Sequence, residues 1–396
     1  MDGRATGGIL RAGGTPHDGG ILRFFRDVPD PRASNVVHKL HDILVLAICG
    51  VICGADGWVE VEEFGNSKLA WFRTFLELPD GIPSHDTFGR VFARLDPDAF
   101  ERRFTAWVAS VAGASGGRLV AIDGKAIRRS FEHAWDRGGM AHLVSAFVDA
   151  NRMVFGQVAV AGKSNEIEAI PRLLALLDLA GATVTVDAMG CQRAVAREVN
   201  DRGGRYVLAV KENQPALYAA VKALLDEAVL DGFDGMRHGY REHTDGGHGR
   251  VETRRVWVTD EVTWLGGELL GQWAGLGSGS IAVVESVRQD LGDLTGQVTT
   301  ERRYFISSLP GTDADRMARV VRGHWAVENK LHWQLDVSFR EDERRIRKGH
   351  GAENYSRLCR LALNLLKRDR TVKIGVHGKR LKAGWDEHYL LRLLTG

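Results

Sequence analysis

Two short runs that each predict a strand, each followed at once by an aspartate, constrain the fold of this chain more than any other feature. The first is Leu119–Ile122 before Asp123, and the second is Thr183–Val186 before Asp187. Short runs of this kind are typical of strands buried on both faces of a sheet that helices cover. If the two strands are parallel neighbours, both carboxylates lie side by side at one end of that sheet.

The elements predicted around these runs indicate a mixed α/β sheet with helical layers. Three strands in a row are followed by helix, strand, helix and strand, which is also the element order of the ribonuclease-H-like fold. The other predicted elements are strands at Leu143–Val148 and Met153–Val160, a helix opened by Pro171, a helix from Cys191 to about Asp201, and a strand at Tyr206–Val210.

The sequence predicts six parts along the chain. The long gap between Asp187 and the next candidate carboxylate, Glu328, predicts a β-rich insertion within the sheet domain. The stretch before the sheet domain is helical, with Ser84 as the N-cap of one helix. It forms either a helix-turn-helix domain or a helical cap on the sheet domain. The parts are a disordered tail at 1–20, the helical N-terminal domain at 21–112, the first part of the core at 116–231, the insertion at 232–300, the second part of the core at 301–370, and a basic segment at 371–396.

Composition narrows the class of protein without deciding its function. The net charge of +2 does not by itself indicate nucleic-acid binding. Between Arg360 and Lys382, however, eight basic residues face one acid, Asp369, which fits either a solvated tail or an arm that contacts phosphates. The four cysteines have no metal-binding spacing, no secretory signal opens the chain, and the apolar run Ile43–Cys53 is too short to cross a bilayer. We therefore expect a cytoplasmic protein with reduced thiols and no membrane partner.

Glu328 is the third candidate carboxylate, and it is predicted to lie on a helix. Val321, Trp325, Glu328, His332 and Leu335 recur on one face of such a helix. A carboxylate on a largely apolar stripe needs a cationic partner or a metal, so a buried ion pair with an arginine is the plain alternative. Two strand-end aspartates in the same domain favour a metal, because three carboxylates suit two divalent cations and phosphodiester chemistry.

A helical zinc site is a further alternative. His324, Glu328 and His332 are spaced by four residues, but the sequence contains no HExxH motif. The two histidines are then expected only to flank a carboxylate site.

Several cations are predicted near the same end of the sheet, where they would suit a polyanionic substrate. Lys125 and Arg128 follow the first aspartate, and Lys211 and Gln214 follow the strand that ends at Val210. The glycine-rich stretch 245–250 predicts a turn into the strand at Val251, and this turn leaves His248 and Arg250 able to touch DNA phosphates. Ordinary surface placement is the alternative for each of them singly.

With these residues in place, the chain resembles bacterial insertion-sequence transposases of the DDE class, in the H-repeat-associated (ISAs-type) branch. The resemblance covers nearly everything from about 21 to 370, and its segments occur in the family's order. They are Val28-Pro-Asp-Pro-Arg32, Gly81-Ile-Pro-Ser-His-Asp-Thr-Phe88, Ala121-Ile-Asp-Gly-Lys125, Lys163-Ser-Asn-Glu166, Thr185-Val-Asp-Ala-Met-Gly-Cys-Gln192, Lys211-Glu-Asn-Gln214, Gly247-His-Gly-Arg-Val-Glu252, His324-Trp-Ala-Val-Glu-Asn329 and Leu335-Asp-Val-Ser-Phe339.

The resemblance implies a ribonuclease-H-like catalytic core interrupted by a β insertion, with a helical N-terminal domain that recognises the element's ends. It implies Asp123, Asp187 and Glu328 as the catalytic triad, holding two Mg²⁺ ions, with Mn²⁺ able to substitute. It also implies double-stranded DNA as the partner and a homodimer on that DNA.

The sequence departs from the wider group of relatives around the glutamate. Their motif Tyr-x₂-Arg-x₃-Glu-x₆-Lys here reads Val321, His324, Glu328 and Leu335, so only the glutamate is kept. The basic roles are then assigned to His324, Arg322 or Lys330, and a hairpin intermediate is not carried over. The predicted function is metal-dependent cleavage at element ends and strand transfer. The alternatives are a metal-dependent nuclease on the same fold and a non-catalytic DNA-binding remnant.

Overall fold

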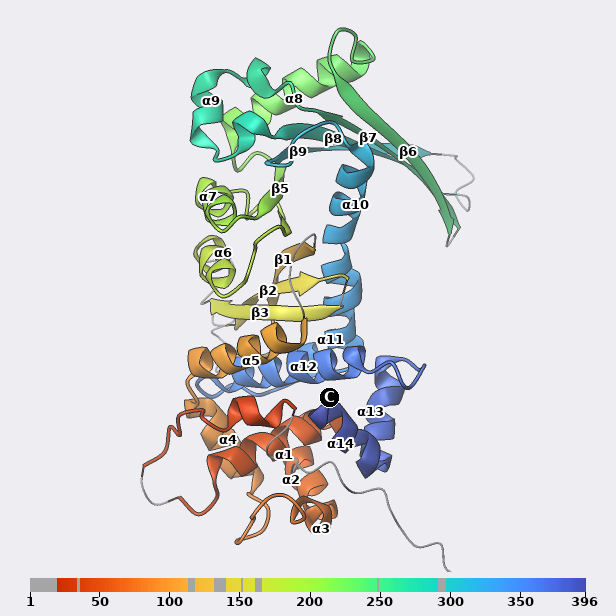
Figure 1. Ribbon diagram of the computed structural model, residues 1–396. Coiled ribbons are helices and arrows are strands. Elements are labelled where there is room, and N and C mark those ends of the chain that lie inside the picture. The colour runs from red at the N-terminus through yellow and green to blue at the C-terminus, as the bar shows by residue number, and fades with distance from the viewer. Residues whose placement is uncertain are drawn as a thin grey trace, which may run out of the picture. The chain divides into compact units, whose positions relative to one another are not determined.

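The computed structural model describes residues 20–33, 36–112, 118–131, 140–150, 152–160, 166–247, 249–290 and 297–396. They form two compact units (Figure 1). The first contains the described residues up to Val108 together with Ser338–Gly396, and the second is Ala109–Val337. The tail predicted to be disordered, residues 1–20, lies outside the described residues apart from Gly20.

The first unit is helical and is built from both ends of the chain. Helix α1 (Leu40–Cys53) is its centre, because every residue from Ile43 to Ile52 is buried. Helices α2, α12 and α13 pack against it. The elements of this unit are η1 (Leu22–Phe25), α1, α2 (Trp58–Ser67), α3 (Leu69–Phe72), α4 (His85–Arg94), α5 (Pro97–Ala112, whose last turn runs into the second unit), η7 (Glu341–Glu343), α12 (Gly351–Arg368), α13 (Val376–Trp385) and α14 (Glu387–Thr395).

Two local predictions for this unit can be compared with the structure. The Ser84 hydroxyl accepts a hydrogen bond from the Thr87 backbone N–H and caps α4, as predicted. The basic stretch after Arg360 is neither a solvated tail nor a free arm, because it folds into α12 and α13 and buries Arg360, Lys379 and Arg380. A guanidinium or ammonium group buried in this way needs hydrogen-bond acceptors inside the protein. The segment therefore offers fewer exposed basic side chains to phosphates than its sequence suggests.

No single helix of the described residues is long and apolar enough to cross a membrane. The bent pair of α1 and α2, at 96° to each other, passes the same test of length and composition.

The second unit is built on one nine-stranded sheet with the order β3-β2-β1-β4-β5-β9-β8-β7-β6 (Figure 1). The pairs β1–β4 and β4–β5 are parallel and all the others are antiparallel. The first five strands in this order have the ribonuclease-H-like arrangement. The strands are β1 (Leu119–Ala126), β2 (His142–Val148), β3 (Met153–Val160), β4 (Thr183–Val186), β5 (Arg205–Val210), β6 (His238–Gly247), β7 (Arg250–Thr259), β8 (Ser280–Asp290) and β9 (Val298–Ser307).

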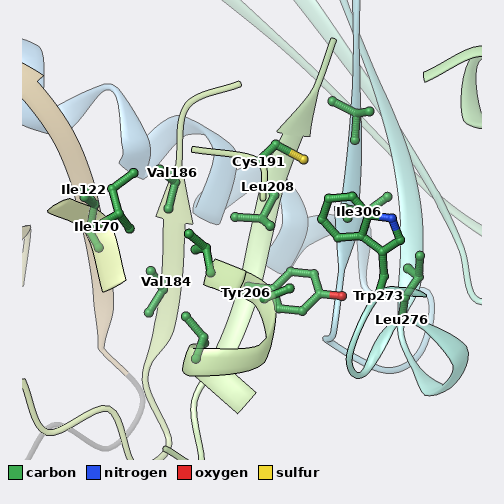
Figure 2. Close-up of a cluster of buried hydrophobic side chains, with 14 of the residues drawn as sticks. Ile122, Ile170, Val184, Val186, Cys191, Tyr206, Leu208, Trp273, Leu276 and Ile306 are labelled. Atoms are coloured by element: carbon green, nitrogen blue, oxygen red, sulfur yellow. The ribbon is translucent and has the colours of Figure 1, made fainter. Parts of the chain in front are cut away.

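Helices cover both faces of this sheet. Helices α6 (Glu166–Ala175), α7 (Arg193–Asp201) and α8 (Pro215–Leu230) lie on one face, and α10 (Ala314–His324) lies on the other (Figure 1). On the first face, Ile122 and Val186 pack with Ile170 of α6 in a continuous apolar core (Figure 2). On the second face, Met317 and Val320 of α10 pack against strands of the insertion.

The predicted β-rich insertion extends the core sheet and is not a separate body. Its last strand, β9, pairs with β5, and the strands β6, β7 and β8 follow outward. Between β7 and β8 lie η4 (Val262–Leu265), α9 (Gly267–Gln272) and η5 (Leu276–Ser278). Trp273 and Leu276 from this stretch pack beside Tyr206 and Ile306 (Figure 2), so the insertion shares the core of the sheet.

The predicted start of one helix is wrong. Pro171 does not open α6, which begins at Glu166 and carries the proline inside. An internal proline removes one helical hydrogen bond. Ala169, Ile170, Leu173 and Leu174 of the same helix are buried against the sheet, and this burial offsets the loss.

Candidate active site

The sheet register places two predicted site residues beside each other. Strands β1 and β4 are parallel, and Ile122 is paired with Val186. Asp123 directly follows Ile122, and Asp187 directly follows Val186. Both residues therefore lie beside each other where the pairing of β1 with β4 ends. Asp123 does not close its strand as predicted, because β1 continues to Ala126 by pairing with β2. Successive side chains of a strand alternate between faces. Ile122 and Val186 point into the core on the α6 face (Figure 2), so the two aspartates point to the face covered by α10.

The third predicted residue, Glu328, lies on a break in the helix that the sequence predicts as continuous. Helix α10 ends at His324, a π-helical segment, η6, follows at Val327–His332, and α11 continues from Trp333 to Val337. A π-helical turn holds an extra residue and shifts the face that later side chains present. As a result, Glu328 is exposed, and it is not the buried partner of an arginine.

The charges of Asp187 and Glu328 both act on Asp123. Burial, and next the negative charge of Asp187, raise the pKa of Asp123 from 3.8 to about 7; the charges of Glu328 and Glu166 act in the same direction. The Gly124 N–H opposes this rise by donating a hydrogen bond of 2.9 Å to Asp123 Oδ1. Neighbouring carboxylates raise a pKa because each disfavours the charge of the other.

Two histidines of the α10–α11 region contact this end of the sheet at different places. His332 Nδ1 lies 3.6 Å from Asp123 Oδ2. His324 Nδ1 lies 3.1 Å from the hydroxyl of Thr185, two residues before Asp187. Burial lowers the pKa of His324 to about 4, so this ring is neutral and helps to join the glutamate-bearing helix to strand β4. The contact of His324 with DNA phosphates stays a prediction; its side chain is half-buried and its Nδ1 faces the Thr185 hydroxyl.

Among the described residues, no three acidic, histidine or cysteine side chains are arranged so that they could hold a metal ion, which also leaves the helical zinc set without support. The donor chemistry nevertheless fits a hard divalent ion, since carboxylate oxygens are its preferred ligands. A cation would also relieve the repulsion that raises the Asp123 pKa. The residues therefore fit Mg²⁺ or Mn²⁺ chemically, and Glu328 still has to converge on the two aspartates.

Three predicted DNA-contacting cations are held in ion pairs within the unit. Lys125 Nζ lies 2.7 Å from Asp336 Oδ1, and Lys330 Nζ lies 2.7 Å from Asp149 Oδ1. Arg322 pairs with Asp245 at 2.9 Å. The pairs of Lys330 and Arg322 lie on the surface, where such pairs contribute little stability and a phosphate can compete for the cation. The Lys125 side chain is only 9% exposed, so its pair is less accessible.

The other predicted contacts differ in how exposed they are. Arg128, Lys211 and Arg250 are exposed. Gln214 instead donates from Nε2 to the carbonyl of Cys191 at 3.0 Å, and so ties the loop after β5 to the loop after β4. His248 lies outside the described residues.

Sequence reasoning missed two residues close to Asp123. His142 on β2 contacts Glu166 at the start of α6, and both are buried. The only signal was the segment Lys163-Ser-Asn-Glu166, which the family resemblance contained but to which no role was attached.

The order of this sheet defines a protein with a ribonuclease-H-like fold. Two aspartates lie beside each other on its adjacent parallel strands, and a glutamate lies on the segment that follows the covering helix. Residues 114–365 match the family described as "Transposase DDE domain", and residues 22–108 match the domain described as "DDE_Tnp_1-associated". The chain belongs to this transposase family.

Relatives at full length agree with the family. "Putative transposase YncI" from Escherichia coli O157:H7 is 40% identical over 376 residues, which are 95% of this chain and 94% of that protein. "H repeat-associated putative transposase YhhI" from Escherichia coli K12 is 38% identical over 377 residues, 95% of this chain and 98% of that protein. A piggyBac transposase synaptic complex with hairpin DNA aligns with 94% of this chain and 75% of that chain, at 9% identity and a TM-score of 0.38.

Proposed function

We propose that the protein cleaves phosphodiester bonds at the ends of an insertion sequence and joins the freed ends to target DNA. The observation that carries this proposal is the parallel pairing of β1 with β4 beside the glutamate-bearing segment. It sets Asp123 beside Asp187 and leaves Glu328 near enough for its charge to act on Asp123. Family membership supports the same chemistry.

In this proposal, Asp123, Asp187 and Glu328 hold divalent cations through their carboxylate oxygens. Two such ions, when bound, activate the nucleophile and stabilise the leaving oxygen. The three side chains act only as ligands, so none of them forms a covalent bond to DNA. In the first reaction, water attacks phosphorus, the bond to the 3′-oxygen breaks and a 3′-hydroxyl is released. In the second, that hydroxyl attacks a target phosphorus, and the target strand's own 3′-oxygen leaves.

Cations near the site are proposed to bind the DNA backbone. Arg128, Lys211 and Arg250 are exposed, while Lys125, Lys330 and Arg322 exchange carboxylate partners for phosphates. Binding should therefore weaken steeply with salt, because each neutralised phosphate releases a counterion. Two ends have to be processed together, and we propose a homodimer on double-stranded DNA.

The test is to incubate the purified protein with a duplex containing its own element end, a target plasmid and either Mg²⁺ or Mn²⁺. Asp187→Asn is the matched inactive variant. We expect cuts at the element end and new joints in the plasmid with the natural sequence only. Cuts without joints would favour a metal-dependent nuclease. Binding to the ends without cleavage in either metal would show a DNA-binding remnant and overturn the catalytic assignment.

A further inference from the structure

A buried polar pair lies behind the strand that carries Asp123. His142, the first residue of β2, donates a hydrogen bond from Nε2 to Oε1 of Glu166, the first residue of α6. Each residue is only 7% exposed. A buried pair of this kind gives little net stability compared with apolar side chains of similar size. Packing alone therefore gives no reason for a histidine and a glutamate at this place.

Gly124 makes the room that this pair occupies. A Cβ atom at Gly124 would lie 2.7 Å from Glu166 Cδ and 3.0 Å from His142 Nε2, closer than side chains tolerate. In the β1–β2 register Gly124 is opposite Val144, so His142, two residues before Val144, shares its face. The Glu166 carboxyl group therefore rests directly on the backbone of β1.

The same glycine also holds the Asp123 carboxylate. Its N–H donates to Asp123 Oδ1 at 2.9 Å. Asp123 points to the α10 face, whereas Gly124 and the buried pair are on the α6 face, because neighbouring strand residues alternate. The pair thus supports, from behind, the peptide that orients Asp123 from the front. The negative charge of Glu166 also acts on Asp123 across the strand.

We propose that Glu166, held by His142 against Gly124, is a positioning residue that fixes Asp123 for divalent-cation binding. This inference rests on the proposed function and adds two residues that do not touch DNA or the reacting atoms. Partners that orient metal ligands typically change metal affinity by about 10- to 100-fold when they are removed. A merely structural pair would change the melting temperature but not the affinity of the folded protein for metal.

The experiment measures Mn²⁺ binding to the DNA-free, full-length protein by calorimetry, with thermal unfolding recorded for every variant. Glu166→Gln keeps the size of the side chain and removes its charge. Gly124→Ala keeps every charge and displaces Glu166. The matched control is Glu168→Gln, which removes an exposed carboxylate from the same helix. We expect the first two variants to bind Mn²⁺ at least about 10-fold more weakly while still folded, and the control to bind it like the natural protein.

Asp187→Asn separates the two levels of the proposal. If Asp187→Asn loses Mn²⁺ binding while Glu166→Gln and Gly124→Ala bind normally, the positioning role is wrong and the proposed function stands. If the natural protein binds no Mn²⁺, or Asp187→Asn binds it unchanged, the proposed function fails and the positioning role fails with it. If Gly124→Ala does not fold, Glu166→Gln decides the question.

Discussion

At the scale of single residues, the ionised form of Asp123 destabilises the folded state, and a bound cation would remove this destabilisation. Its pKa is raised from 3.8 to about 7, chiefly by burial and by Asp187. A carboxyl group with a raised pKa in the folded state stabilises the fold fully only below its unfolded pKa. That contribution is lost as pH rises through the folded pKa. In the absence of metal, the second unit should therefore lose stability between about pH 4 and pH 7.

Asp123→Asn should remove this pH dependence. A shift of this size corresponds to at most about 4 kcal/mol, so with a chelator at pH 8 the variant should be more stable than the natural protein by up to that amount. Urea unfolding of both proteins from pH 4 to pH 8 measures it, with Asp201→Asn, an exposed aspartate of α7, as the control. Equal pH profiles for Asp123→Asn and the natural protein would contradict the prediction.

The hydrogen bond between Thr185 and His324 is the second prediction at this scale. It joins the strand of Asp187 to the helix that leads to Glu328, with a donor–acceptor distance of 3.1 Å. Thr185→Val and His324→Asn should each slow metal-dependent cleavage by about 10-fold or more, because small displacements of reacting groups are costly. The double variant should be no slower than either single one, since both remove the same interaction.

The measurement is the cleavage rate at saturating DNA for the two single variants and the double variant. Thr183→Val is the control, because Thr183 is also buried and lies on the same face of β4. Strictly additive losses in the double variant would mean that the two residues act separately.

At the scale of elements, the π-helical segment Val327–His332 decides where Glu328 and His332 point. Removing Asn329 should convert it to ordinary α-helix and rotate everything after it by about 100°. The contact of His332 with Asp123 and the ion pair of Lys125 with Asp336 would then be lost. We expect no cleavage, with the far-ultraviolet circular dichroism and DNA binding retained. The Asn329→Ala variant keeps the register and should cleave normally. Cleavage by the deletion variant would show that the π-helical segment is not needed to direct Glu328 and His332.

The same segment shows where sequence reasoning ends. The side-by-side placement of Asp123 and Asp187 was predictable, because each follows a short run rich in β-branched or other apolar residues, and such runs indicate buried strands. That β1 continues past Asp123 to Ala126 was not predicted. The residues from Val321 to Leu335 carry an unbroken helical spacing, so the π-helical turn between them leaves no mark in the sequence. Trp325, a member of that predicted apolar stripe, lies before the π-helical turn and is 39% exposed.

Contacts between elements that are distant in the sequence could not be predicted from it either. His142 and Glu166 meet only because β2 pairs with β1 and α6 lies over that face. Neither residue is distinguished by local pattern, and Pro171 suggested a later start for α6 than the true one. Sequence thus located the candidate carboxylates, and the structure supplied the residues that we propose to orient them.

At the scale of the whole molecule, the chain forms its helical unit from its two ends. The family match to the DDE domain extends to residue 365, whereas the compact unit that contains the sheet ends at Val337. Helix α12, beyond that boundary, packs on α1 and α4 of the helical unit. The predicted core segment 301–370 is therefore divided between the two units, because the buried face of α12 is matched by the N-terminal helices.

One buried ion pair joins the two ends within this unit and gives the last prediction. Arg357 of α12 donates from Nε to Glu101 of α5 at 2.7 Å, and the two side chains are 1% and 3% exposed. Glu101→Gln leaves the guanidinium without its buried counter-charge, and such a loss costs about 3–5 kcal/mol. Glu353→Gln is the control, because Glu353 contacts the same arginine from a more exposed position and leaves the Glu101 pair intact.

Thermal unfolding followed by circular dichroism should show the helical unit melting earlier in Glu101→Gln and much less change in Glu353→Gln. Because the carboxylates of the candidate site all lie in the second unit, Mn²⁺ binding at low temperature should be the same in both variants and in the natural protein. Loss of Mn²⁺ binding in Glu101→Gln while the protein is still folded would mean that the helical unit takes part in forming the metal site, and that the division into two units does not hold for function.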